Sequence, residues 1–408
     1  MNIYKLTKLI ARTILYSPAI PIVIIIRLLT PIFTIRFLGL AGSRIGPLTA
    51  STELYLCEKE AGINIPKRLF FDIVYIKDLP ICNHFLISLW KRTILIWPRW
   101  LIYPITWLNE FIPGGTIHKI KTTKNDRDIN NLIDNSKQHV YLNSQEELIG
   151  KKILLEMGVP ENKNFVCLLV RDNAYLKKYV DSRKNWDYHN YRDSSIENFL
   201  DAAEFLVTKG YYVIRMGREV NEDFYSEKHE IIDYAKSKWR SDFMDIYLAS
   251  KCHFCISTGS GWDALVETLF RKPIIHVNLV PFVQIHTYSK YCISTTKRHY
   301  SEVLKRDLTL SEIFEFGLAN AHSSLQYNEK KIKLIENTPE EILDVVKEML
   351  DLLNGKVKAI DSDNLIVTKF WKIFIDSINK YLPNELLHGE IKSLYSITYL
   401  KKYITWLN

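Results

Sequence analysis

The sequence predicts an α/β fold with parallel sheets. Its second half contains short apolar runs, bounded by polar or turn residues, that are typical of buried strands. They lie at 164–170, 211–215, 231–234, 252–257 and 274–277. Segments with helical spacing separate them, and this alternation predicts crossover connections with helices on both faces of a parallel sheet. A length of 408 residues, 47% of them hydrophobic, allows two domains with sizeable cores.

The first 40 residues are apolar and basic. Their longest charge-free run, 13–26, has 14 residues, fewer than the roughly 20 that a spanning helix needs. Because prolines also interrupt the run, we expect an in-plane helix followed by a strand near 33–40. A spanning helix and a wholly buried segment are the alternatives. The Trp-rich stretch at 90–112 is either a second membrane-surface segment or part of the first core.

A glycine-containing loop after residue 40 leads into a predicted helix. Ser51 or Thr52 would cap this helix. That cap places Glu53 in the first helical turn, where the helix dipole favours a carboxylate. A second strand is expected at 67–76.

The formal net charge of +8 lies entirely in residues 1–120. That part holds 14 Lys/Arg and 6 Asp/Glu, whereas the rest of the chain holds 40 of each. A basic, apolar and aromatic end favours an anionic membrane surface over nucleic acid, and no nucleic-acid-binding motif accompanies it. The six scattered cysteines indicate reduced, buried thiols. The lone CxxC of Cys252 and Cys255 lies in a predicted strand, so we assign it no metal.

The ends of the predicted strands carry the candidate site, because open parallel sheets bind ligands beyond the carboxyl ends of their strands. The loop 258–261 joins a strand to a helix, and its free N–H groups would suit a nucleotide diphosphate; an ordinary turn is the alternative. Arg171 and Arg215 end two other strands, and an arginine fork suits a diphosphate. Alternatively, Arg171 pairs with a nearby carboxylate and Arg215 caps a sheet edge. The predicted binding residues are Arg171, Asp172, Arg215, Gly217, Asp242, Thr258, Gly259, Ser260 and Gly261.

Three segments of the second half resemble a known family: FVCLLVRDNAYL, NYRDSSIENFLDAAEFLVTKGYYVIRMGRE and IIDYAKSKWRSDFMDIYLASKCHFCISTGSG. Over residues 165–280 they look like the bacterial glycosyltransferases found with surface-polysaccharide and O-antigen genes, and 43–56 resembles that family more loosely. The family is distantly similar to fucosyltransferases, in which a strand-end arginine holds the nucleotide-sugar phosphates. The matching residue here is Arg171. Leu169 stands where fucosyltransferase-type proteins usually have His, so the role of that His does not transfer.

The resemblance implies a GT-B-like fold, in which two Rossmann-like domains face each other across a cleft, followed by C-terminal helices. We expect a membrane-associating segment at 1–40 and an acceptor domain at 33–145. A nucleotide-sugar domain is expected at 150–355. Helices at 360–408 are expected to pack back on the N-terminal domain.

The implied activity is transfer of a sugar from a nucleotide-sugar donor to a glycan acceptor, expected to be lipid-linked, in bacterial surface polysaccharide synthesis. The protein would lie on the cytoplasmic face of the inner membrane, peripherally or, less favoured, through a single-pass N-terminal anchor. Arg171 would stabilise the leaving diphosphate and Glu53 would act as general base. We expect no cofactor and no metal, because Asp242 and Asp245 lack DxD spacing and no His/Cys ligand cluster is apparent. A glycerophosphotransferase-type enzyme and a non-catalytic membrane-associated binding module are the alternatives.

Overall fold

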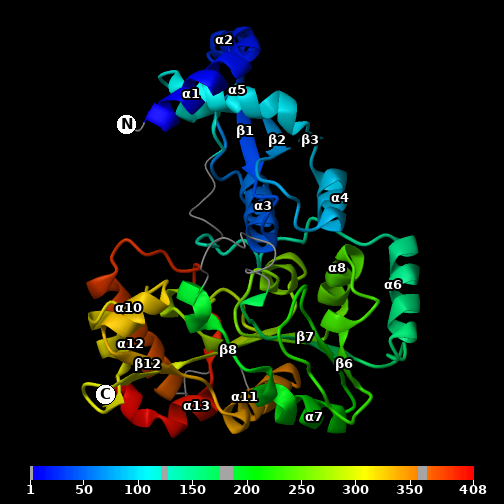
Figure 1. Cartoon of the computed structure of the whole chain (residues 1–408), viewed down its shortest axis with the longest axis vertical. Helices are drawn as coiled ribbons and strands as arrows, with labels where there is room; N and C mark the ends of the chain where they lie inside the picture. The colour runs from blue at the N-terminus through cyan, green and yellow to red at the C-terminus, as the bar shows by residue number, and fades with distance from the viewer. Residues whose placement is uncertain (1–2, 121–126, 175–186, 357–364) are drawn as a thin grey trace. The chain divides into compact units, whose positions relative to one another are not determined.

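The chain forms two units in the computed structural model (Figure 1). Unit 1 comprises Met1–Asp126 and His139–Tyr141, and unit 2 comprises Arg127–Gln138 and Leu142–Asn408. Each unit contains a parallel sheet flanked by helices, so the expected α/β class is confirmed. The residues that the structure describes are 3–120, 127–174, 187–356 and 365–408.

The sheet of unit 1 has three parallel strands in the order β1 (Thr34–Leu40), β2 (Phe70–Ile76) and β3 (Ile96–Trp97). The strands expected near 33–40 and 67–76 are therefore confirmed. Arg36 of β1 is paired in register with Asp72 of β2, and its Nε lies 2.7 Å from Asp72 Oδ1. Both side chains are almost fully buried. This basic residue of the N-terminal segment therefore serves the sheet and is not available to a membrane surface.

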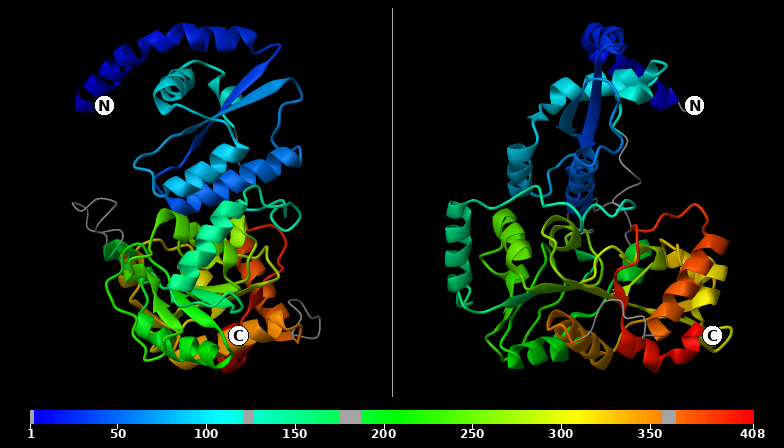
Figure 2. Two further views of the ribbon diagram at one scale, coloured as in Figure 1. Left: turned by 90° about the vertical axis from the view of Figure 1, so that its right-hand side faces the viewer. Right: turned by 180° about the vertical axis from the view of Figure 1, so that it is seen from behind.

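The N-terminal segment is helical from residue 3 to residue 29, through α1 (Ile3–Tyr16), the 3-10 turn η1 (Ser17–Ala19) and α2 (Ile20–Leu29). The α-helix is interrupted at Pro18 and Pro21, as expected, because α1 ends before Pro18 and α2 begins just before Pro21, but the chain stays helical through η1. Each proline occupies one of the first two positions of its element, where the missing N–H costs no helical hydrogen bond. The left view of Figure 2 shows the resulting gently curved helical path.

The other helices of unit 1 are α3 (Ile45–Glu60), α4 (His84–Thr93), α5 (Arg99–Phe111) and the 3-10 turn η2 (Gly115–His118). One core joins α2 and α5 to the sheet. It contains Ala19, Val23, Ile26, Phe37, Tyr75, Ile102, Ile105 and Leu108. The stretch 90–112 therefore contributes to this core, although Trp100 at the start of α5 is 77% exposed.

The helix α3 begins six residues earlier than Ser51. Pro47 in its first turn is compatible with a helical start. Thr52 does not cap it, because its Oγ1 donates back to the carbonyl of Leu48 at 2.6 Å. Glu53 consequently lies in the middle of α3 and is fully buried, so its predicted place in a first turn is wrong.

Seven parallel strands form the sheet of unit 2, in the order β13-β9-β8-β7-β4-β5-β6. The five predicted strands correspond to β4 (Phe165–Leu169), β5 (Tyr212–Arg215), β6 (Ile231–Asp233), β7 (Phe254–Ser257) and β8 (Ile274–Leu279). Two strands were not predicted, β9 (Cys292–Thr296) and β13 (Leu394–Tyr395). Each is polar or very short, so no apolar run marks it.

Helices cover both faces of this sheet. Figures 1 and 2 show α7 (Leu200–Thr208) and α11 (Pro339–Leu353) on one face, and α8 (Asp242–Lys251) on the other. Ser241 caps α8, because its side chain accepts from the backbone N–H of Met244. The remaining elements are α6 (Ser144–Glu156), η5 (Asp187–Arg192), η6 (Ile196–Phe199), η7 (Tyr234–Lys236), the π-helical turn η8 (Ala264–Leu269), η9 (Phe282–Gln284), β10 (Arg298–Ser301), β11 (Arg306–Asp307), α9 (Leu310–Glu315), α10 (Ser324–Glu329), β12 (Ile332–Ile335), α12 (Leu365–Tyr381), α13 (Ile397–Lys402) and η10 (Ile404–Leu407).

The C-terminal helices belong to unit 2. Phe370 of α12 and Leu400 of α13 are fully buried in the main core of unit 2. Strand β13 precedes α13 and pairs with β9 at the sheet edge. This pairing fixes the C-terminal segment to the sheet of unit 2.

Candidate functional site

A cavity of about 470 Å³ lies at the edge of the unit 2 sheet where the strands end. Residues that follow β4, β5 and β9, together with the end of β12, form its wall. Open parallel sheets bind their ligands at this edge. We call it the sheet-edge cavity; it is lined by Asp172, Asn173, Asn190, Tyr191, Asp193, Ser194, Ser195, Asn221, Glu222, Lys297, Leu334 and Glu336.

Arg171 adjoins the wall of the sheet-edge cavity. Its Nη1 lies 3.0 Å from Asp193 Oδ1 and donates to the carbonyl of His189 at 3.2 Å. Burial and the nearby Arg192 lower the pKa of the Arg171 guanidinium to about 10, and Asp193 opposes this effect. Burial also raises the pKa of the Asp193 carboxyl to about 6. The predicted alternative, in which Arg171 pairs with a carboxylate, is therefore present in the structure, and the guanidinium stays charged at neutral pH.

The glycine loop lies beside Arg171, as the strand-end argument predicts. The backbone N–H of Arg171 donates to Thr258 Oγ1 at 2.8 Å. Arg192 donates from its guanidinium to the carbonyl of Gly259 at 2.7 Å. Gly259 has a φ of +81°, which favours glycine at this turn.

The N–H groups of this loop are not available to an anion in the way we expected. The N–H of Gly259 donates to Ser257 Oγ at 3.1 Å, and the N–H of Ser260 donates to Asp263 Oδ2 at 2.7 Å. Asp263 thus supplies the negative charge that a ligand would otherwise bring. The helical turn that follows is the π-helical η8, which begins at Ala264. These bonds favour the alternative prediction, in which 258–261 is an ordinary turn and not an anion-binding loop.

Arg215 is also engaged inside the protein. Its side chain is 1% exposed, and its Nη1 lies 3.0 Å from Asp233 Oδ2. The same nitrogen donates to the carbonyl of Glu222 at 3.1 Å. Arg215 therefore does not reach the sheet-edge cavity as a phosphate ligand but supports Glu222, which lines it.

Of the other predicted residues, Asp172 lines the cavity, whereas Gly217 and Asp242 do not. Asp172 lines the cavity and joins two strand-end loops, because its Oδ2 accepts from the N–H of Asn221 at 2.7 Å. Gly217 lies after β5, where an added Cβ would meet Val220 Cγ1 at 2.6 Å. Asp242 lies in the first turn of α8 and is not among the lining residues.

Lys297 is a cavity residue that sequence analysis missed. It follows β9 directly, is 4% exposed, and its Nζ lies 3.5 Å from Glu336 Oε1. Its Nζ also donates to the backbone carbonyl of Asp193. Burial lowers the pKa of the Lys297 ammonium, and Glu336 opposes this effect. A basic residue at the end of a strand could have predicted this role, but β9 was not recognised as a strand because its sequence is polar.

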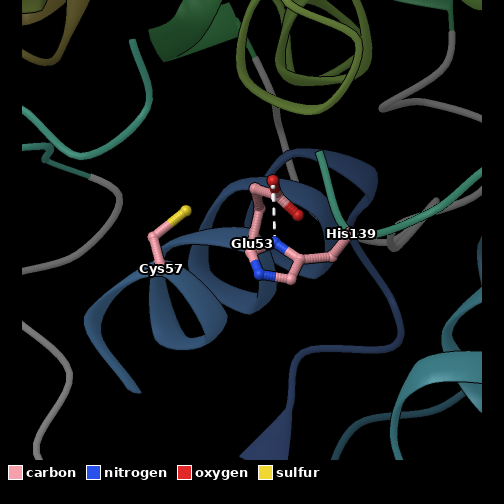
Figure 3. A group of neighbouring side chains, drawn as sticks. All are labelled: Glu53, Cys57 and His139. Carbon is pink, nitrogen blue, oxygen red and sulfur yellow. Dashed lines mark ion pairs between the residues drawn. The ribbon is translucent and has the colours of Figure 1, made fainter. Parts of the chain in front are cut away.

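Glu53 lies in unit 1 beside Cys57 and His139 (Figure 3). Its Oε1 is 3.1 Å from His139 Nδ1, and Glu60 Oε1 is 3.1 Å from His139 Nε2. Burial lowers the pKa of the His139 imidazole, but Cys57 and Glu53 outweigh this effect and raise it to about 10. Glu53 is therefore buried and paired with His139, and its role as general base stays a prediction.

No protein-family model matches the sequence, and comparison with curated proteins gives no match. Among solved structures, the chain is similar to the ADP-heptose lipopolysaccharide heptosyltransferase II of E. coli, with 13% identity, a TM-score of 0.39, and coverage of 79% of this chain and 100% of that chain. It is also similar to a glycosyl transferase family 9 protein of Veillonella parvula DSM 2008, with 10% identity, a TM-score of 0.44, and coverage of 78% and 97%. Both TM-scores are too low to carry an argument about the activity of this chain.

Proposed function

We propose that the protein is a glycosyltransferase that binds a nucleotide-sugar donor in the sheet-edge cavity of unit 2. The observation that carries the proposal is the position of two cations, the largely buried Arg171 and the buried Lys297, beside a polar cavity at the ends of parallel strands. Ligands of open α/β sheets bind in this position. Arginine and lysine are also the side chains that bind phosphate groups.

The remaining wall suits the sugar and ribose parts of such a donor. Asp172, Glu222 and Glu336 offer carboxylate groups, and Asn173 and Asn190 offer amides. These side chains can accept or donate hydrogen bonds to hydroxyl groups. In the reaction, an acceptor hydroxyl oxygen would form a bond to the anomeric carbon while the bond to the diphosphate breaks, and the hydroxyl proton would pass to a carboxylate of the wall. The cations would stabilise the charge on the departing nucleoside diphosphate.

We expect nucleoside diphosphates and nucleotide sugars to stabilise the protein in a thermal-shift panel. A ligand at a hundredfold excess over its dissociation constant stabilises the folded state by about 2.7 kcal/mol. Replacing Arg171 with Ala or Lys297 with Met should weaken binding more than tenfold. Arg171→Lys should restore binding only in part, because lysine lacks the planar fork. A donor panel that includes CDP-glycerol separates sugar transfer from glycerophosphate transfer.

Two variants make this test decisive. Arg171→Ala combined with Asp193→Asn leaves no unpaired carboxylate, so a loss of binding cannot be attributed to an exposed charge at Asp193. Arg306→Ala is the matched control, since Arg306 also pairs with a carboxylate, 2.7 Å away on Glu312, but lies outside the cavity lining. If the double variant binds every nucleotide as tightly as the wild type, the donor site is not at the sheet-edge cavity.

We also propose that donor binding needs no metal, because side-chain cations can neutralise the diphosphate. Nucleotide affinity should therefore stay the same within a factor of about two when EDTA replaces Mg²⁺ or Mn²⁺, as measured by isothermal titration. A fall of tenfold or more that Mg²⁺ reverses would contradict this.

Finally, we propose that unit 1 attaches the enzyme to an anionic membrane surface, where a lipid-linked acceptor would present its sugar. The described helical stretch Leu6–Leu29 is long and apolar enough to cross a membrane by length and composition, and 17% of its most apolar window is buried in the protein. Val23 and Ile26 of α2 pack in the core of unit 1. Because one face of α2 is bound to the protein, its exposed face suits insertion in the plane of the membrane.

Liposome flotation tests this attachment. The double variant Ile25→Glu/Leu28→Glu places charges on residues that are 56% and 74% exposed, and it should lose most of its binding to vesicles containing phosphatidylglycerol. The control Leu148→Glu/Leu155→Glu makes the same change on residues of α6 that are 68% and 49% exposed, and it should float like the wild type. Release by high salt or alkaline washes would indicate peripheral attachment, whereas release by detergent alone would indicate a spanning helix.

A further inference from the structure

Three side chains of unit 2 that are far apart in sequence meet beside the sheet. They are Glu267 of η8, His276 of β8 and His286, which follows η9. We call them the His-Glu cluster. Glu267 Oε2 lies 3.4 Å from His276 Nε2 and 2.5 Å from His286 Nδ1. One ligand atom from each residue lies within 4.8 Å of the other two.

Burial makes this cluster unusual. The side chains of Glu267 and His276 are each 1% exposed, whereas that of His286 is 28% exposed. Among the described residues, Glu267 Oε1 and His276 Nδ1 are buried polar atoms without a hydrogen-bond partner. A buried polar atom without a partner is unfavourable, because the loss of its hydration is not compensated. Each atom is the second oxygen or nitrogen of its side chain, so the contacts among the three residues do not use it.

We propose that the His-Glu cluster binds a divalent transition-metal ion, with Zn²⁺ as the best match. Two imidazoles and one carboxylate form a ligand set that zinc takes in sites with an open fourth position. Zinc bonds of about 2.0–2.2 Å place neighbouring ligand atoms about 3.3 Å apart. The distance of 3.4 Å between Glu267 and His276 already fits this geometry. His286, the most exposed member of the cluster, would retreat slightly from the carboxylate.

The surroundings of the cluster suit such a site. Asp263 Oδ2 lies 3.9 Å from His276 Nδ1, where a carboxylate can orient a metal-binding imidazole through its other nitrogen. Cys292 is fully buried, and its Sγ lies 3.9 Å from the carbonyl of His286. The thiol also interacts with the carboxylate of Glu267, so it can be tested as a fourth ligand. The turn η8 that carries Glu267 is π-helical, a geometry frequently found at functional sites.

Sequence analysis expected no His/Cys ligand cluster, and that expectation is wrong, because the fold brings His276 and His286 together with Glu267. The spacings 267–276–286 match no short metal motif. The residues meet only after a strand and a turn have formed, so no local pattern marks them. A second group, Glu53, Cys57 and His139, also has ligand atoms within 4.8 Å of one another in unit 1. It has a single imidazole, whereas the His-Glu cluster supplies the two imidazoles and one carboxylate that match a zinc ligand set. For this reason we assign the metal to the His-Glu cluster and use the second group as a control.

Zinc titration of the chelator-treated full-length protein, against a competing indicator, tests the proposal. We expect His286→Gln to bind one zinc ion fewer per chain than the wild type, or to weaken that ion more than tenfold. His276→Gln should behave in the same way. His253→Gln alters a half-buried histidine of unit 2 outside the cluster and should bind as the wild type does. His139→Gln should also keep the wild-type stoichiometry.

Cobalt substitution provides a readout independent of activity. Co²⁺ should give visible bands typical of four-coordinate cobalt in the wild type and lose them in His286→Gln, and a sulfur-to-metal band lost in Cys292→Ser would identify the fourth ligand. His286 lies in a partly exposed loop, so His286→Gln should fold even if His276→Gln does not; circular dichroism checks both. Equal zinc stoichiometry and affinity in the wild type and in folded His286→Gln would overturn the proposal. The result is independent of the donor site, because nucleotide binding is measured separately.

Discussion

Replacing Asp233 with Ala is expected to destabilise unit 2 by about 3–5 kcal/mol, the cost of leaving one partner of a buried ion pair uncompensated. Asp233 ends β6 and accepts from Arg215, whose side chain is 1% exposed. Its Oδ2 also accepts from the N–H of Phe224 at 3.2 Å. Without Asp233, Arg215 would keep the carbonyl of Glu222 as a partner, which does not neutralise its charge.

Urea denaturation at neutral pH measures the effect. Asp344→Ala removes the partner of Lys347 in an exposed pair and should cost no more than about 1 kcal/mol. Replacing both members, as Arg215→Met with Asp233→Leu, should recover most of the loss because it removes the stranded charge. If Asp233→Ala costs no more than the exposed control, water reaches Arg215 and the ion pair is not a buried one.

This ion pair also shows that an arginine at the end of a strand does not by itself indicate whether it binds a ligand or a carboxylate of the protein. The sequence correctly placed Arg171 and Arg215 at the ends of neighbouring strands. It could not reveal that β6 adds Asp233 to the sheet edge, directly in register with Arg215. A diphosphate ligand and an internal carboxylate satisfy an arginine equally well. The choice between them depends on a residue 18 positions away in the chain.

For the glycine loop 258–261 too, the sequence predicted the backbone but not the ligand. Its strand, turn and helical segment were predicted correctly from apolar runs and glycines, but its ligand was not. Ser260 and Asp263 have the spacing of a capping box, in which the acidic side chain accepts from the N–H of the first residue. The observed bond from Ser260 N–H to Asp263 follows that pattern. This signal was present in the sequence and argued against free N–H groups.

Other parts of the site depended on contacts that no local pattern predicts. Lys297 follows a polar strand, and Glu336 reaches the same cavity from β12. The start of α3 was misplaced because its first residues were assigned to a glycine-containing loop, whereas Gly46 and Pro47 lie in the first turn of the helix. The strong apolar strands, in contrast, were found because a buried parallel strand needs a continuous apolar run.

Replacing Phe370 with Ala is expected to cost about 3–5 kcal/mol, as is usual for a large aromatic side chain removed from a packed core. Phe370 is fully buried on α12. Its ring centroid lies 4.1 Å from that of Tyr395 in β13 and 5.8 Å from that of Trp406 in η10. One side chain therefore holds together the helix, the edge strand and the C-terminal turn.

Urea denaturation followed by circular dichroism tests this packing, with Ile375→Ala as the control on the same helix. Ile375 is 37% exposed, so its truncation should cost less than about 1 kcal/mol. The location of the C-terminal helices depends on the result. If Phe370→Ala is no more destabilising than Ile375→Ala, α12 is only loosely attached to unit 2. A large and selective loss would instead show that the C-terminal segment is part of the sheet-containing core. Side chains of β13 and η10 would surround the cavity left by Phe370, and they cannot fill it without moving the edge of the sheet.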